Sequence, residues 1–246
     1  MSDSGQITPA AKFRSDVTVE LVRSAAEDSD VVWSARVSTA GEKSLEAQSE
    51  DPNASKGLIN FLMKNRHGTP FEHNSMTFMI SAPIFVFREF HRHRVGWSYN
   101  EESGRYRELA PVFYVPGPDR KLVQVGKAGH YEFLDGTAEQ SRLVHEATLR
   151  ACERSYAAYQ QMLDAGVARE VARGVLPVNT FSTMYATCNA RSLMSFLSLR
   201  TKDNESHFPS YPQREIEMVA EKMEAEWARL MPITHACFVA NGRVSP

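Results

Sequence analysis

Apolar residues at alternate positions predict three strands along the chain. Val17–Val22 has this period of two, with Val17, Val19 and Leu21 on one face. Residues 76–81 alternate in the same way, and residues 180–188 are rich in the β-branched and aromatic side chains typical of strands. We therefore expect a sheet whose strands come from distant parts of the chain.

Apolar residues three and four positions apart predict helices between these strands. Asn53 is a candidate N-cap, and Pro83 suits the first turn of the helix that follows it. The predicted helices cover residues 28–38, 53–64, 84–94, 137–165, 168–175, 190–200 and 215–230. The longest is expected to bury a side formed by Leu143, Ala147, Leu149, Tyr156, Tyr159 and Met162.

The segments without a regular spacing of apolar residues are few and polar. Residues 1–12 are predicted to form a flexible tail, and residues 98–109 and 202–210 to form irregular connections. No internal repeat or composition shift marks a linker in the remainder. Residues 13–246 are therefore predicted to form a single α+β domain.

Composition narrows the class of protein. The 246 residues carry 28 Lys+Arg against 30 Asp+Glu, a net charge of -2, and 42% of them are hydrophobic, which is ordinary globular composition. No apolar stretch approaches the roughly 18 residues of a membrane span, and the three cysteines are widely spaced. We expect a cytoplasmic protein that binds no membrane, and one in which local arginine clusters capture anions.

The densest polar cluster spans residues 88–106. On the predicted helix, Arg88 and Arg92 lie one turn apart, and two guanidinium groups on one face suit a phosphate dianion. A solvated basic stripe is the structural alternative. A metal site at His91 and His93 is disfavoured, because alternate helical positions point to different sides. Base stacking on the nearby aromatic residues is a third alternative, but the net charge argues against a nucleic-acid groove.

Three further segments carry polar side chains, and each also has a purely structural interpretation. Residues 67–73 (HGTPFEH) place two histidines, a hydroxyl and a carboxylate between a helix and a strand. Glu170 and Arg173 share a helical face and can form a surface ion pair. Residues 189–191 lie where a strand becomes a helix, so Asn189 is equally an N-cap and part of an anion site.

Together these four segments resemble the flavin-dependent thymidylate synthases, the ThyX family. The family signature is Arg-His-Arg followed by a short spacer and Ser, and here residues 92–94 are followed by eight residues and Ser103. The resemblance covers roughly residues 17 to 235 in the family's order. It implies a homotetramer with an α+β fold around a central twisted, mainly antiparallel sheet flanked by helices. It also implies FAD at subunit interfaces and C5-methylation of dUMP to dTMP, with methylenetetrahydrofolate as carbon donor and NADPH as reductant.

The resemblance also implies residue roles. Arg200 is expected beside the uracil ring, His67 beside flavin and folate, and Ser103 is the third residue expected to be catalytic. The expected substrate contacts are Arg88, Glu89, Arg92, Glu101, Glu102, Ser103, Gly104, Arg105, Tyr106, Arg173 and Arg200, with Glu170 orienting Arg173. The expected flavin contacts are His67, Thr69, Arg92, His93, Arg94, Val95, Glu101, Asn189, Ala190, Arg191 and Ser195.

The chain departs from the commonest family pattern at three places. The spacer before Ser103 is one residue longer, Glu89 stands where many members have Gln, and Ser195 stands where a longer polar residue is common. Together with the polar connection at residues 202–210, these differences allow a changed selectivity between ribose and deoxyribose. The first alternative is therefore a relative that methylates UMP. The more distant alternative is a non-catalytic protein that binds a flavin, a nucleotide or RNA.

Overall fold

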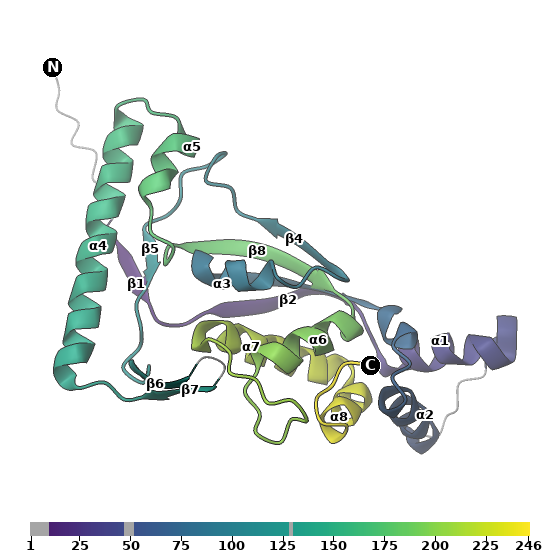
Figure 1. Cartoon of the computed structure of the whole chain (residues 1–246). Helices are drawn as coiled ribbons and strands as arrows, with labels where there is room; N and C mark the ends of the chain where they lie inside the picture. The colour runs from purple at the N-terminus through teal and green to yellow at the C-terminus, as the bar shows by residue number, and fades with distance from the viewer. Residues whose placement is uncertain (1–9, 47–51, 128–129) are drawn as a thin grey trace. The chain divides into compact units, whose positions relative to one another are not determined.

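A computed structural model describes residues 10–46, 52–127 and 130–246 of the chain (Figure 1). The predicted tail thus lies largely outside the described residues. The described residues form two compact units. Unit 1 contains residues 10–16, 81–88, 101–127 and 130–183, and unit 2 contains residues 17–46, 52–80, 89–100 and 184–246. The extent of domains along the chain stays a prediction.

Unit 2 is built on most of a four-stranded sheet. Thr77 and Thr187 place their hydroxyls 2.9 Å apart on neighbouring strands, and further along the Ile84 N–H donates to the Thr180 carbonyl. Residue numbers rise along one strand as they fall along its neighbour, so these two strands are antiparallel. In spatial order the strands are β2 (Thr18–Ala25), β3 (Ser75–Pro83), β8 (Phe181–Cys188) and β4 (Trp97–Glu101).

The helices of unit 2 cover this sheet with apolar faces. Helix α7 buries Ile216, Val219, Met223 and Trp227, and it contacts β2, α6 and α8. In Figure 1, α6, α7 and α8 accordingly lie close together. The helices are α1 (Asp28–Ala40), α2 (Pro52–Lys64), α6 (Ala190–Arg200), α7 (Arg214–Leu230) and α8 (Pro232–Ala240), with short 3₁₀ turns η1 (Gly41–Lys43) and η2 (Thr69–Glu72).

Unit 1 is organised around the long helix α4 (Ala138–Asp164). Its N-cap Thr137 forms a capping box with Gln140, and Tyr156 and Tyr159 pack in a core with Phe113. The other elements are α3 (Ile84–Phe90, shared with unit 2), α5 (Arg169–Ala172), η3 (Arg173–Val175), the parallel pair β1 (Lys12–Arg14) and β5 (Val112–Tyr114), and the antiparallel hairpin β6 (Val123–Lys127) and β7 (His130–Leu134).

The predicted fold class is confirmed, since antiparallel strands are flanked by helices. Several boundaries differ. The expected inner side of α4 is wrong at Leu143 and Ala147, which are exposed. Asn53 lies inside α2, and part of the segment predicted to be irregular forms β4. Helix α8 was not predicted. No helix among the described residues is long and apolar enough to cross a membrane, and Cys152, Cys188 and Cys237 are free and buried.

The helix predicted over residues 84–94 ends at Phe90, so the arrangement of Arg88 and Arg92 on one helical face is wrong. The His93 N–H donates to the Phe90 carbonyl at 2.8 Å in a tight turn. The Tyr99 hydroxyl also donates to the carbonyls of Phe90 at 3.1 Å and His93 at 2.7 Å. A tyrosine from β4 therefore holds the turn that follows α3, through the carbonyls of Phe90 and His93.

Candidate functional site

The start of α6 collects three of the predicted flavin contacts. The Asn189 side chain accepts a hydrogen bond from the Ser192 N–H at 2.9 Å, which makes Asn189 the N-cap. The Ala190 N–H donates to the side chain of Asn74 at 2.7 Å, from the residue just before β3. Two of the helix's first N–H groups are thus already satisfied, so an anion here must be held mainly by side chains.

The guanidinium of Arg191 is fixed by groups on several sides. Its Nη1 lies 2.5 Å from Oε1 of Glu72, and its Nε donates to the backbone oxygen of Pro246 at 2.7 Å. The guanidinium also packs against Gly68, where an added Cβ would clash with it. Sequence reasoning missed the contacts made by Glu72, Asn74 and Pro246.

The Arg-His-Arg segment forms the turn after α3 and is attached to α6. The Ser192 hydroxyl donates to the Val95 carbonyl at 2.9 Å. Gly96 has φ of +70°, and its Cα packs so close to Ser192 that a side chain has no room. Arg92 and Arg94 are exposed and form no ion pair among the described residues. This turn therefore presents two cations beside the start of α6.

Arg200, at the other end of α6, is paired on two sides. Its Nε donates to Nε2 of His93 at 3.1 Å, and its Nη1 forms an ion pair with Glu89. Burial, followed by the charges of Arg200 and Arg92, lowers the pKa of His93 to about 4. Near pH 7 the imidazole is therefore neutral, and its Nε2 is a hydrogen-bond acceptor.

A second group of predicted residues lies within unit 1. The Arg105 N–H donates to the Ser103 hydroxyl at 3.3 Å, and the space for a Cβ on Gly104 is limited by the Arg173 side chain at 3.2 Å. The Arg105 side chain lies over the exposed ring of Tyr106, 5.8 Å from its centroid. The structure thus brings this segment and Arg173 together.

The expected pairing of Glu170 with Arg173 is wrong, because Glu170 binds Arg105 instead, with Oε2 2.9 Å from Nε. Arg173 makes no ion pair among the described residues and is exposed, as is Arg88. Glu102 pairs with Arg107 at 3.2 Å. Unit 1 therefore also holds arginines whose charges are not neutralised by a carboxylate of the described chain.

The remaining predicted residues have simpler surroundings. The ring of His67 packs edge-on against Phe61, with centroids 5.7 Å apart, and Thr69 begins η2. Ser195 is exposed on α6, and Glu101 is half-buried at the end of β4. In the described parts of the chain, no group of three or more His, Cys, Asp and Glu side chains is placed to hold a metal ion.

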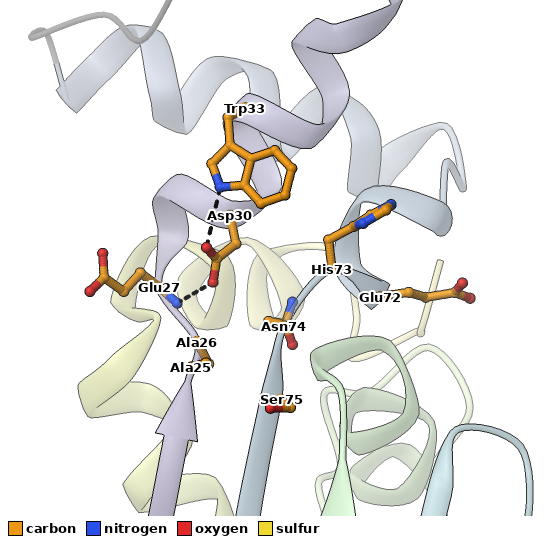
Figure 2. A pocket seen from close by; sticks show the side chains of 9 residues that line it. All are labelled: Ala25, Ala26, Glu27, Asp30, Trp33, Glu72, His73, Asn74 and Ser75. Atoms are coloured by element: carbon orange, nitrogen blue, oxygen red, sulfur yellow. Dashed lines mark hydrogen bonds between the residues drawn. The ribbon is translucent and has the colours of Figure 1, made fainter. Parts of the chain in front are cut away.

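A pocket of about 620 Å³ lies between the start of α1 and the residues before β3 (Figure 2). Its lining includes the acidic residues Glu27, Asp30 and Glu72, but the carboxylates of Asp30 and Glu72 already have partners in the protein. The Asp30 carboxylate accepts hydrogen bonds from the Glu27 N–H at 2.8 Å and from the Trp33 indole at 3.3 Å. Figure 2 shows the Glu72 carboxylate pointing away from Asp30, and it pairs with Arg191. The polar groups of this pocket thus cap α1 and support Arg191.

Comparison with known proteins covers nearly the whole chain. Residues 20–233 match the family model described as "Thymidylate synthase complementing protein". A protein of Streptomyces coelicolor, described as a flavin-dependent thymidylate synthase, is 68% identical over 246 residues, 100% of both chains.

Two solved structures of the UMP/dUMP methylase PolB from Streptomyces cacaoi are similar to this chain. The complex with 5-Br dUMP has 56% identity, a TM-score of 0.91, and covers 96% of this chain and 100% of that chain. The complex with 5-Br UMP has 52% identity and a TM-score of 0.89, covering 97% and 100%.

Proposed function

Because the chain belongs to the family of flavin-dependent thymidylate synthases, we propose that this enzyme catalyses the reductive C5-methylation of dUMP to dTMP. FAD, methylenetetrahydrofolate as one-carbon donor and NADPH as reductant belong to the proposal, as does a homotetramer with active sites at subunit interfaces. A bound flavin supplies hydride-transfer chemistry, while the protein binds, orients and stabilises charge.

The observation that carries this proposal is the fixed guanidinium of Arg200. With Nε on His93 and Nη1 on Glu89, Nη2 is the group left to donate to a ligand. Uracil C5 becomes nucleophilic when the ring gains negative charge, and a preorganised donor beside N3 and its carbonyls stabilises that charge. Neutral His93 orients the guanidinium without adding a second positive charge.

Phosphate binding is assigned to residues 103–105, Arg88 and Arg173 of unit 1, and the family resemblance adds Arg92 of unit 2. The uncompensated charges of these last three arginines support this assignment, because a dianion suits several guanidinium groups that have no carboxylate partner. The Ser103 hydroxyl is proposed as a donor to the substrate.

The residues around the start of α6 fit the anionic diphosphate of FAD. Arg191 packs flat on Gly68, where a Cβ would fill the space, and the unpaired Arg92 and Arg94 lie on the turn that Ser192 attaches to this helix. Arg191 and Arg94 are proposed to hold the diphosphate, and His67 to lie beside the flavin and the folate. This donor set carries the positive charge that binds a diphosphate.

Methylation of UMP is the second candidate function. The UMP/dUMP methylase PolB, which is 56% identical to this chain, supports it, and that protein's structures contain brominated forms of both nucleotides. A pocket that does not exclude a 2′-hydroxyl accepts both sugars.

Reoxidation of the flavin in the absence of oxygen tests the proposal. The protein is reconstituted with FAD, reduced with NADPH, and mixed with methylenetetrahydrofolate and either dUMP or UMP. Return of the oxidised flavin spectrum together with a C5-methylated nucleotide is the expected result, and the faster nucleotide identifies the preferred substrate. A protein that binds FAD but forms no methylated product from either nucleotide would contradict the proposal.

A further inference from the structure

Residues 243–246, which follow α8 and are here called the strap, contact both ends of α6. At the far end of α6, Arg243 donates from Nη2 to the hydroxyl of Thr201 at 2.8 Å. Arg243 is itself held by Glu224, with contacts of 2.8 and 2.7 Å to the two carboxylate oxygens. Since its side chain is only 8% exposed, Arg243 is a firm anchor for the strap.

At the start of α6 the strap holds Arg191 by both its backbone and its side chain. The Ser245 hydroxyl donates to the Arg191 carbonyl at 3.0 Å, and the backbone oxygen of Pro246 accepts from Nε at 2.7 Å. With Nη1 on Glu72, two of the three guanidinium nitrogens are occupied, and Nη2 is left for a ligand. Removal of the strap would free the side chain to rotate away from Gly68.

We propose that the strap is a positioning element of the flavin site, which sets the guanidinium of Arg191 and fixes the start of α6. The inference rests on the proposed function, in which Arg191 binds the FAD diphosphate. Nothing in the strap needs to touch the flavin, because its contribution is transmitted through Arg191. An arginine whose fork is oriented before binding loses less rotational freedom when the anion arrives.

The test is FAD affinity of the purified full chain, measured by quenching of flavin fluorescence. Ser245→Ala removes one hydrogen bond and is expected to weaken FAD binding about 2- to 10-fold. Deletion of residues 245 and 246 removes both contacts and is expected to weaken binding more. Ser245→Thr keeps the hydroxyl and should restore wild-type affinity. Asn241→Ala is the matched control, because Asn241 bonds to Asn60 and Cys237 and not to α6.

A double-mutant cycle separates positioning from general stability. In an Arg191→Lys background the Ser245→Ala change should have less than a twofold further effect on FAD affinity. The guanidinium through which the strap is proposed to act is absent from that background. If Ser245→Ala lowers the melting temperature as Asn241→Ala does but leaves FAD affinity unchanged, the strap is only structural and the inference is overturned. Wild-type protein that binds no FAD would instead overturn the proposed function.

Discussion

Replacement of Arg200 by lysine tests the role of the planar guanidinium while keeping its charge. Arg200 is largely buried, with 18% of its side chain exposed, and it uses separate nitrogens for His93 and Glu89. A lysine ammonium is a single point that cannot keep both contacts and still present a donor in the plane of the substrate ring.

The expected loss of kcat in Arg200→Lys follows from the proposed role of the Arg200 N–H donor. Loss of one preorganised donor aimed at developing negative charge costs about 100- to 1000-fold in kcat, or roughly 3 kcal/mol of activation free energy. FAD binding should change less than about twofold, since the proposed diphosphate contacts of α6 lie at its other end. If Arg200 acted only through its positive charge, the lysine variant would retain most of the activity.

Anaerobic rapid mixing provides the assay. FAD-reconstituted, NADPH-reduced Arg200→Lys is mixed with dUMP and methylenetetrahydrofolate, and the rate of flavin reoxidation and the yield of dTMP are measured. Arg214→Lys is the matched control, because Arg214 pairs with Glu217 and Glu221 on the surface of α7. A rate within fivefold of wild type, with FAD bound, would refute the role assigned to Arg200.

Three further predictions concern stability and the flavin site. Burial raises the pKa of Glu224, but the hydrogen bonds and charges of His235 and Arg243 outweigh it and lower this pKa from 4.5 to about 2. Its contribution of about 3 kcal/mol should therefore be present above pH 4.5 and disappear as the pH falls towards 2, and urea denaturation of Glu224→Gln should lack this loss. Tyr99→Phe removes the hydroxyl that donates to the carbonyls of Phe90 and His93. It should lower the free energy of unfolding by about 1–2 kcal/mol in the same assay, mainly through the lost hydrogen bond to His93. Gly68→Ala should displace the Arg191 guanidinium and weaken FAD binding measurably in a fluorescence titration. The matched Gly57→Ala, where a Cβ meets nothing within 4 Å, should leave FAD binding unchanged.

The sequence predicted the helices that are defined by interactions between residues close in the chain. The long helix α4 has a capping box and buried residues at Cys152, Tyr156 and Tyr159 in its second half, and α6 begins after a residue, Asn189, that caps its own helix. Both were recognisable from the sequence because the interactions that define them span a few residues.

The elements that were missed depend on distant partners. Helix α8 begins at Pro232, just after the helix predicted over residues 215–230. At its start the Asp28 carboxylate accepts from the N–H groups of Ile233 at 2.9 Å and Thr234 at 2.7 Å. The cap is thus supplied from the other end of the sequence. For the same reason the partners of the predicted site residues could not be recognised from local sequence patterns. Glu72 and Arg191, for example, are 119 positions apart.

The arginines of the candidate site divide into two kinds according to whether a carboxylate of the chain accompanies them. Glu89, Glu72 and Glu170 pair with Arg200, Arg191 and Arg105. Such a pair neutralises much of the charge but fixes the direction of the remaining N–H groups, which suits recognition of a ring or a defined oxygen.

Other arginines keep their full charge. No carboxylate of the described chain pairs with Arg88, Arg92, Arg94 or Arg173, and their exposure lets them adjust to a ligand. A nucleotide carries both kinds of group, a planar base and a phosphate dianion, and FAD does likewise. A protein with a net charge of only -2 therefore needs both kinds of arginine, the paired ones for orientation and the unpaired ones for attraction of the anion.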